Sequence, residues 1–199
     1  MAGGRSATRD RLVKGRWIGV VREKTNEAGR RAAENLFQGG CPAIEITMTT
    51  PGAIELIRGF SGRGEPLVGA GTVLDAAQAA AAAAAGARFL IAPVAPAEVL
   101  EAGHAAGLPV VLAGLTPGEL HAAHRAGSDL VKVFPVGPVG GPDYIRVVLG
   151  PLRDLPLVAT GGIADEDIPA YFAAGAVMVG VARPWPDVSS VETVRRVVG

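Results

Sequence analysis

The strongest constraint on the fold is a repeated unit of an apolar stretch, a helix-forming stretch and a glycine. The glycines that close these units are Gly40, Gly86, Gly107, Gly127 and Gly175. Glycine readily adopts the left-handed conformation that commonly ends a helix. The stops at 86, 107 and 127 lie 21 and 20 residues apart, the length of one strand and one helix, and the longer intervals of 46 and 48 residues can hold two units each. The spacing therefore predicts strands and helices in alternation.

Eight apolar runs supply the strands of this repeat. They cover residues 17–21, 43–47, 67–72, 89–93, 109–113, 130–134, 157–160 and 177–181. The runs are continuously apolar, which is typical of a parallel sheet covered on both faces. Eight strands alternating with helices predict an α/β fold, a (β/α)8 or TIM barrel. A doubly wound sheet is the alternative, but it usually has fewer units and a glycine-rich first turn, and residues 20–23 are Val-Val-Arg-Glu.

Length and composition bound the organisation. The 199 residues suit one barrel domain over 1–199, with 1–10 expected to be a frayed end before a short N-terminal helix. Lys plus Arg and Asp plus Glu both number 19, and no apolar run is long enough to span a membrane, so neither nucleic acid nor a membrane is an expected partner. The single cysteine, Cys41, cannot form an internal disulfide, which agrees with a cytoplasmic location.

Four helix starts carry capping signals. Thr50-Pro51 has the pattern of an N-cap followed by proline at the first helical position. Asp75 precedes an alanine-rich run. Two pairs have the spacing of a capping box, Thr116 with Glu119 and Ser189 with Glu192. These signals place a helix after each of the corresponding strands.

Lys132 is a lysine within an apolar strand. It lies in the run 130–134, whereas the other two lysines, Lys14 and Lys24, lie in polar stretches. An ammonium ion is costly to remove from water, so burial favours the neutral amine, which can attack a carbonyl carbon and form a Schiff base. The alternative is a lysine at a strand edge whose charged end reaches solvent.

Glu45 is a second charge within an apolar strand. The active site of a parallel barrel lies at the carboxyl ends of its strands, where Glu45 and Lys132 are both expected. A carboxylate facing an amine there could move protons for Schiff-base chemistry. The alternative is a buried ion pair with only a structural role.

Thr160, Gly161 and Gly162 follow the seventh apolar run. Adjacent glycines let backbone N–H groups approach an anion, and the loops after strands seven and eight often bind phosphate in these barrels. The acidic residues 165–167 just beyond weaken such a site, and a simple turn is the alternative. The three histidines fall on predicted helices away from the strand ends, so no metal centre is expected.

Five motifs occur in the order typical of the bacterial KDPG/KHG aldolases, class I aldolases that act on 2-dehydro-3-deoxy-6-phosphogluconate and 4-hydroxy-2-oxoglutarate. The motifs are Ile44-Glu45-Ile46-Thr47, Gly69-Ala70-Gly71-Thr72-Val73, Pro93, Val131-Lys132-Val133-Phe134-Pro135 and Thr160-Gly161-Gly162-Ile163. The chain resembles that family from about residue 17 to residue 185. The resemblance implies a barrel, lyase activity without a cofactor or metal, a small-molecule oxo-acid substrate with pyruvate as a product, and a homotrimer.

The resemblance also implies roles for individual residues. Lys132 would form the Schiff base, and Glu45 would act as general acid and base. Thr72, Pro93 and Phe134 would line the pyruvate pocket. Arg22 would face the anionic part of the substrate, and Thr160, Gly161 and Gly162 would bind its far end.

Two positions depart from the family's pattern. Thr49 stands where well-studied members carry an arginine for the pyruvate carboxylate, so that carboxylate would fall to Thr47, Thr72, Arg22 or backbone groups. Ala182 stands where members often have a serine for the phosphate. A lost hydrogen bond of this kind is worth about 0.5–3 kcal/mol, which shifts the expectation towards a non-phosphorylated or less phosphate-dependent substrate.

Residues and resemblance together predict a class I Schiff-base aldolase. It would cleave a 4-hydroxy-2-oxo acid, either 4-hydroxy-2-oxoglutarate or 2-dehydro-3-deoxy-6-phosphogluconate, to pyruvate and an aldehyde. Two alternatives stay open. One is a phosphate-binding barrel isomerase or synthase in which Lys132 acts only as a charge. The other is a non-catalytic barrel that binds an oxo acid or serves as an assembly subunit.

Overall fold

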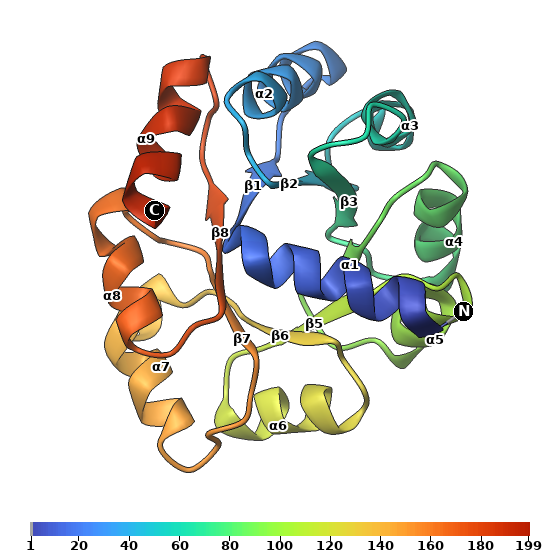
Figure 1. Cartoon of the computed structure of the whole chain (residues 1–199). Helices are drawn as coiled ribbons and strands as arrows, with labels where there is room; N and C mark the ends of the chain where they lie inside the picture. The colour runs from blue at the N-terminus through green and yellow to red at the C-terminus, as the bar shows by residue number, and fades with distance from the viewer. Residues whose placement is uncertain (1) are drawn as a thin grey trace.

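The computed structural model describes residues 2–199, whose strands form a closed parallel barrel inside a ring of helices (Figure 1). The strands are β1 (Trp17–Val21), β2 (Ala43–Thr47), β3 (Leu67–Gly71), β4 (Leu90–Ile91), β5 (Val110–Gly114), β6 (Leu130–Val133), β7 (Leu157–Thr160) and β8 (Met178–Ala182). Each strand pairs with its sequence neighbours, and β8 closes the barrel against β1. The (β/α)8 prediction is confirmed, because a doubly wound sheet would have two open edges.

Helices follow the strands in strict alternation. They are α1 (Ala2–Gly15), α2 (Asn26–Gln38), α3 (Ala53–Ser61), α4 (Ala76–Ala84), α5 (Ala97–Ala105), α6 (Pro117–Arg125), α7 (Gly141–Leu149), α8 (Ile168–Ala173) and α9 (Val188–Val198), with short 3-10 helices η1 (Gly137–Val139) and η2 (Asp165–Asp167). Among the described helices, none has the length and apolar character needed to cross a lipid bilayer.

The predicted helix stops are confirmed by backbone geometry. Gly40, Gly86, Gly107, Gly127 and Gly175 all have positive φ, between +73° and +105°. Residues with a Cβ rarely adopt this region, so glycine ends each helix at low cost. The regular spacing of these glycines therefore reports the length of each βα unit.

Two of the four predicted caps are confirmed. Asp75 caps α4, and Thr116 caps α6 in a complete capping box. The capping box predicted from Ser189 is wrong, because Asp187 is the N-cap of α9 and accepts from Ser190 N. Thr50 does not cap α3, which begins after Gly52 in a left-handed conformation. The Thr50 hydroxyl donates instead to the carbonyl of Val21, 3.2 Å away, so tertiary bonding removes it from the helix end.

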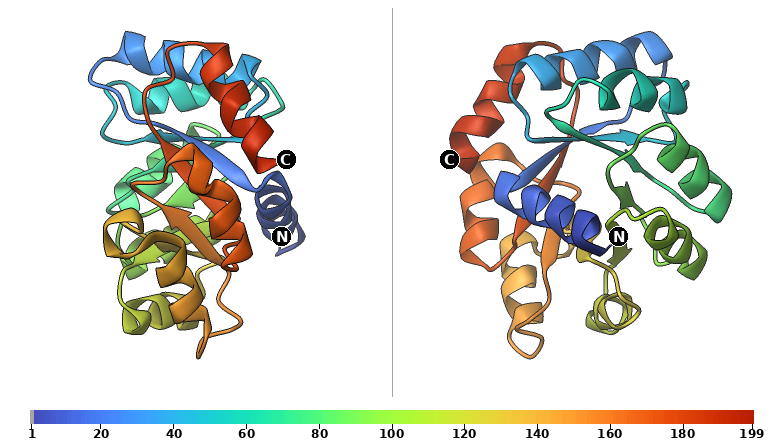
Figure 2. Two further views of the ribbon diagram at one scale, coloured as in Figure 1. Left: turned by 90° about the vertical axis from the view of Figure 1, so that its left-hand side faces the viewer. Right: turned by 45° about the vertical axis from the view of Figure 1, so that its right-hand side comes forward.

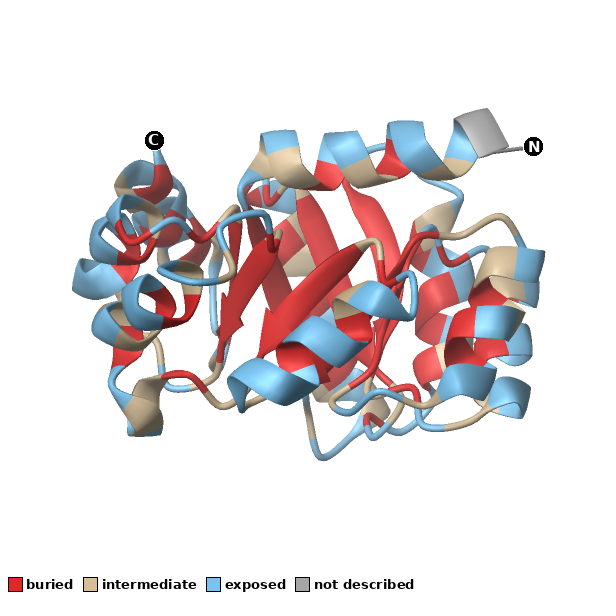
Figure 3. Ribbon diagram, turned by 90° about the horizontal axis from the view of Figure 1, so that it is seen from below, coloured by how far each residue is buried: buried red, intermediate tan, exposed pale blue. Residues whose placement is uncertain are grey.

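Buried residues form an outer layer between the strands and the helices and an inner cluster within the barrel. The strands are buried along most of their length (Figure 3). The inner cluster consists of Leu12, Ile18, Ala43, Leu67, Phe89, Ile91, Val111, Leu130, Val158 and Met178. All but Leu12 come from the strands or, for Phe89, from the residue just before β4. Leu12 comes from α1, which lies across one end of the barrel (Figures 1 and 2). Because α1 leads directly into β1, the end that it covers is the amino-terminal end of the strands.

The predicted frayed end is wrong for residues 2–10, which belong to α1. Thr8 and Leu12 are buried on the side of α1 that faces the barrel, and Arg5 Nε lies 3.3 Å from Asp129 Oδ1. The segment has few apolar residues, so its helix depends on docking against the strands more than on a pattern visible in the sequence. Met1 lies outside the described residues.

Candidate active site

Glu45 and Lys132 both face the interior of the barrel. Each lies two residues beyond a member of the inner cluster, Ala43 in β2 and Leu130 in β6, and side chains two apart share one face of a strand. Glu45 is 2% exposed and Lys132 is 5% exposed. Lys132 therefore does not reach solvent at a strand edge, and both charges lie buried near the carboxyl end of the barrel.

The two charges do not form a direct ion pair. Within residues 2–199, no ion pair of 4.0 Å or less joins Lys132 to Glu45. Their strands, β2 and β6, are four apart in the closed order, so the side chains face each other across the barrel axis. The alternative of a structural ion pair is therefore wrong. The arrangement places the amine and the carboxylate on opposite strands of the barrel.

Gly71 makes room for the Glu45 carboxylate, and the sequence analysis did not identify it as a site residue. A Cβ at Gly71 would lie 1.9 Å from Glu45 Oε1. A sequence signal for this residue is the pair of glycines Gly69 and Gly71, which are two residues apart and therefore share one face of β3. They pair in register with Glu45 and Thr47 of β2. Glu45 Oε1 is buried and has no hydrogen-bond partner in the part of the chain that the structure describes. Such an atom is costly to bury, and it marks a place suited to a polar ligand.

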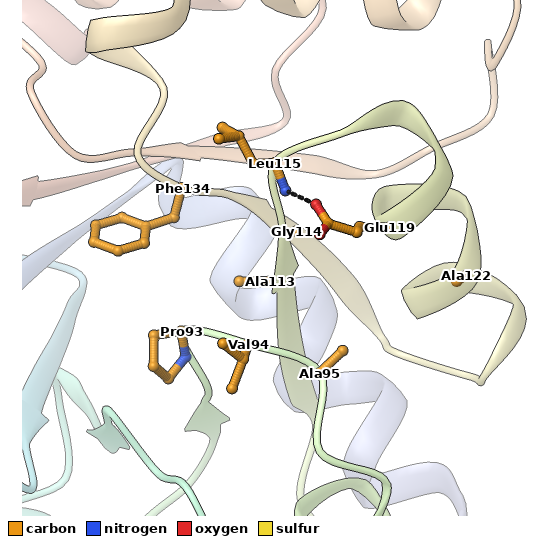
Figure 4. Close-up of a pocket in the computed structure, with 9 residues that line it drawn as sticks. All are labelled: Pro93, Val94, Ala95, Ala113, Gly114, Leu115, Glu119, Ala122 and Phe134. Carbon is orange, nitrogen blue, oxygen red and sulfur yellow. Dashed lines mark hydrogen bonds between the residues drawn. The ribbon is translucent and has the colours of Figure 1, made fainter.

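Phe134 contacts Lys132 and also lines a pocket. Lys132 Nζ lies 4.8 Å from the centre of the Phe134 ring. On the side of β4 and β5, a pocket of about 390 Å³ is lined by Pro93, Ala113, Leu115 and Phe134 among others. Figure 4 shows Pro93 and Phe134 on the same side of this pocket. Two residues predicted to line the pyruvate pocket are thus brought together from different strand ends.

Arg22 and Thr72 meet at the mouth of the barrel. Arg22 Nη2 donates to Thr72 Oγ1 over 3.1 Å, and Arg22 is exposed to solvent. Thr72 has a φ of +56°, which is rare for a β-branched residue and costs about 1–3 kcal/mol. Strained residues of this kind concentrate at functional sites. Arg22 follows β1 and Thr72 follows β3, so the hydrogen bond brings together two side chains that were predicted to bind the substrate.

Thr47 supports the strand ends through its hydroxyl group. Its Oγ1 donates to Val21 O over 3.0 Å and lies 3.1 Å from both Thr49 Oγ1 and Thr50 Oγ1. Because the Thr47 proton is used in this cluster, Thr47 is not a free donor towards the barrel mouth. Arg22 and Thr72 are the predicted residues that remain as donors for a carboxylate.

Thr160, Gly161 and Gly162 lie where the sequence analysis placed them, at the end of β7. Thr160 shares the interior face with Val158, is 4% exposed, and its Oγ1 has no hydrogen-bond partner among the described residues. Gly161 and Gly162 have φ of +90° and +74°. A Cβ on Gly161 would lie 2.9 Å from the Phe134 ring, so glycine is needed there to seat the turn against β6.

A family model described as KDPG and KHG aldolase matches residues 8–194, nearly the whole chain. The chain belongs to this aldolase family. The match covers every barrel strand, including β2 with Glu45 and β6 with Lys132.

Individual members of the aldolase family are similar over most of the chain. The 2-dehydro-3-deoxy-phosphogluconate aldolase of Pseudomonas aeruginosa is 35% identical over 73% of this chain and 67% of the relative. The KHG/KDPG aldolase of Escherichia coli K12 is 31% identical over 84% of this chain and 79% of the relative. A crystal structure of the KDPG aldolase of Legionella pneumophila, with pyruvate captured as a covalent carbinolamine, has a TM-score of 0.79 and 27% identity over 96% of each chain.

Proposed function

We propose that this chain is a class I aldolase that cleaves a 4-hydroxy-2-oxo acid through a Schiff base on Lys132, releasing pyruvate and an aldehyde. The observation that carries the proposal is a buried amine facing a buried carboxylate with an unpartnered oxygen across the barrel. The family supports the assignment, and the Legionella relative holds pyruvate as a covalent carbinolamine.

The proposed reaction uses the two interior groups in sequence. The neutral amine of Lys132 adds to C2 of the substrate and gives a carbinolamine, which loses water after a proton reaches its hydroxyl group. The protonated imine then draws in electrons while the C4 hydroxyl loses its proton, so the C3–C4 bond breaks and the aldehyde leaves. The remaining enamine takes a proton at C3, and water releases pyruvate from Lys132. Glu45 gives and takes these protons from the opposite side of the barrel, directly or through water.

Different residues around the two charges would bind different parts of the substrate. Thr72, Pro93 and Phe134 would hold the pyruvyl part, and Arg22 would face an anionic group. The far end would lie against Thr160 and the backbone N–H groups of Gly161 and Gly162. The unpartnered Thr160 hydroxyl supports a polar contact at that position.

The aldehyde end favours a carboxylate over a phosphate. Ala182, at the end of β8, offers no hydroxyl group for a phosphate. We therefore propose 4-hydroxy-2-oxoglutarate, with glyoxylate as the aldehyde, ahead of 2-dehydro-3-deoxy-6-phosphogluconate, with glyceraldehyde 3-phosphate. A cytoplasmic homotrimer is also proposed, and light scattering of the purified protein would test the trimer.

Trapping of the imine tests the proposed function directly. The protein is incubated with pyruvate, reduced with borohydride, digested and mapped by mass spectrometry. A pyruvate-derived mass gain is expected on the peptide that carries Lys132, and none is expected in a Lys132→Arg variant. An unmodified Lys132 at saturating pyruvate would contradict the proposal and favour a phosphate-binding isomerase or a non-catalytic barrel.

A further inference from the structure

An ion pair joins the loops that follow β7 and β8. Arg183 Nη1 donates to Asp165 Oδ2 over 2.6 Å, and Arg183 Nη2 donates to Ser190 O over 2.5 Å. The side chains of Arg183 and Asp165 are 30% and 18% exposed. The Arg183 guanidinium also lies 5.0 Å from the ring centre of Trp185. The partial burial and the multiple contacts distinguish this pair from the exposed ion pairs on the outer helices, which contribute little.

The pair lies beside the proposed anion-binding turn. Asp165 is three residues beyond Gly162, and Arg183 directly follows Ala182 at the end of β8. On the other side of the turn, Gly137 N donates to Gly161 O over 2.9 Å. The Gly161-Gly162 turn is therefore held by the loop after β6 on one side and, through Asp165, by the residue after β8 on the other.

Arg183 also changes the charge near the turn. Asp165 opens the acidic run 165–167, whose negative charge would oppose an anion at Gly161 and Gly162. Asp165 is the least exposed of these three carboxylate residues, so its charge is the least screened by solvent. The bond from Arg183 offsets that charge.

We propose that Arg183 is a positioning residue for the anionic far end of the substrate. It neutralises Asp165 and holds the loop after β7, so that the backbone N–H groups of Gly161 and Gly162 can bind a carboxylate or phosphate. Arg183 is the residue that follows the last residue of β8, Ala182. It acts through Asp165 and does not touch the substrate itself. This inference rests on the proposed function, because it assumes that the far end lies at the glycine turn.

The test compares substrates that differ only at the far end. In Arg183→Ala, KM for 4-hydroxy-2-oxoglutarate should rise about tenfold, equivalent to about 1.4 kcal/mol, with little change in kcat. KM for 4-hydroxy-2-oxopentanoate, whose far end is an uncharged methyl group, should change much less. Borohydride trapping of pyruvate on Lys132 should be retained, because the pyruvyl part does not reach the turn.

Removal of the opposing charge separates electrostatics from simple loss of structure. Asp165→Asn alone should leave KM for 4-hydroxy-2-oxoglutarate unchanged or lower, and adding it to Arg183→Ala should restore most of the lost affinity. A similar rise in KM for both substrates, or no recovery in the double variant, would overturn the inference. Absence of trapping in the unaltered protein would instead overturn the proposed function, so the two failures are distinguishable.

Discussion

At the residue scale, the site depends on what lies beside each charged group. Glu45 occupies space that only a glycine at 71 leaves open, and Lys132 lies against the Phe134 ring. Neither group forms an ion pair with the other, so each is available to a substrate placed between them. A mutation at Glu45 should therefore lower turnover by removing the carboxylate, and a mutation at Gly71 should lower it by displacing that carboxylate.

Glu45→Gln should remove proton transfer while keeping the volume of the side chain. Turnover is expected to fall by about 10²–10⁴, the usual contribution of a general acid or base. The measurement is kcat from pyruvate release, with the thermal unfolding midpoint showing that the protein is folded. Full activity would exclude Glu45 from the mechanism.

Gly71→Ala should displace the Glu45 carboxylate, because the new methyl carbon would lie 1.9 Å from Oε1. A loss of turnover similar to that of Glu45→Gln is expected. Gly59→Ala is a matched control, since a Cβ at Gly59 in α3 meets no atom within 4 Å. The control should keep full activity and gain about 0.5–1 kcal/mol of stability from the better helix former. Equal activity of both variants would contradict the proposed positioning of Glu45.

At the element scale, α1 closes the end of the barrel opposite the candidate active site. Its Leu12 side chain completes the inner cluster, and Arg5 contacts Asp129 just before β6. Asp129 also accepts from His104 Nε2 and from Val110 N, each over 2.9 Å. A polar segment that the sequence suggests is frayed is thus an ordered element, because the open barrel end supplies its partners.

Leu12→Ala should reduce the free energy of unfolding by about 2–5 kcal/mol, the usual cost of a cavity at a fully buried leucine. The turnover of the folded protein should stay near the original value, since Leu12 lies at the far end of the barrel. Lys14→Ala, at an exposed position of the same helix, should change stability by less than about 0.5 kcal/mol. Denaturant unfolding measures both, and equal stabilities would show that α1 is not part of the cooperative core.

At the scale of the whole molecule, a buried thiol makes the free energy of unfolding depend on pH. Burial raises the pKa of the Cys41 thiol to about 12, and the thiol donates to Ala43 O over 2.9 Å. An unfolded cysteine loses its proton near pH 8.5. The folded state therefore binds this proton more tightly, and the corresponding stability is fully present below about pH 8.5 and declines as pH rises towards 12.

Thiol labelling and unfolding measurements can test this behaviour. At pH 8 the native protein should resist a thiol reagent, whereas the urea-unfolded chain should react at its single cysteine. Between about pH 8.5 and 10.5, the lower part of the window between the unfolded and folded pKa values, the free energy of unfolding should fall more steeply than in Cys41→Ala. Parallel pH curves, or rapid labelling of the native protein, would contradict a buried and inert thiol.

Local patterns in the sequence determined the elements and the identity of the family. Apolar runs and terminal glycines predicted a (β/α)8 barrel, and Lys132 and Glu45 stood out as charges within apolar strands. Only the tertiary structure decided that Glu45 and Lys132 face each other without pairing, that Gly71 makes room for the carboxylate, and that Arg183 binds Asp165. The physical reason is barrel closure, which sets the distances between side chains from strands far apart in the chain.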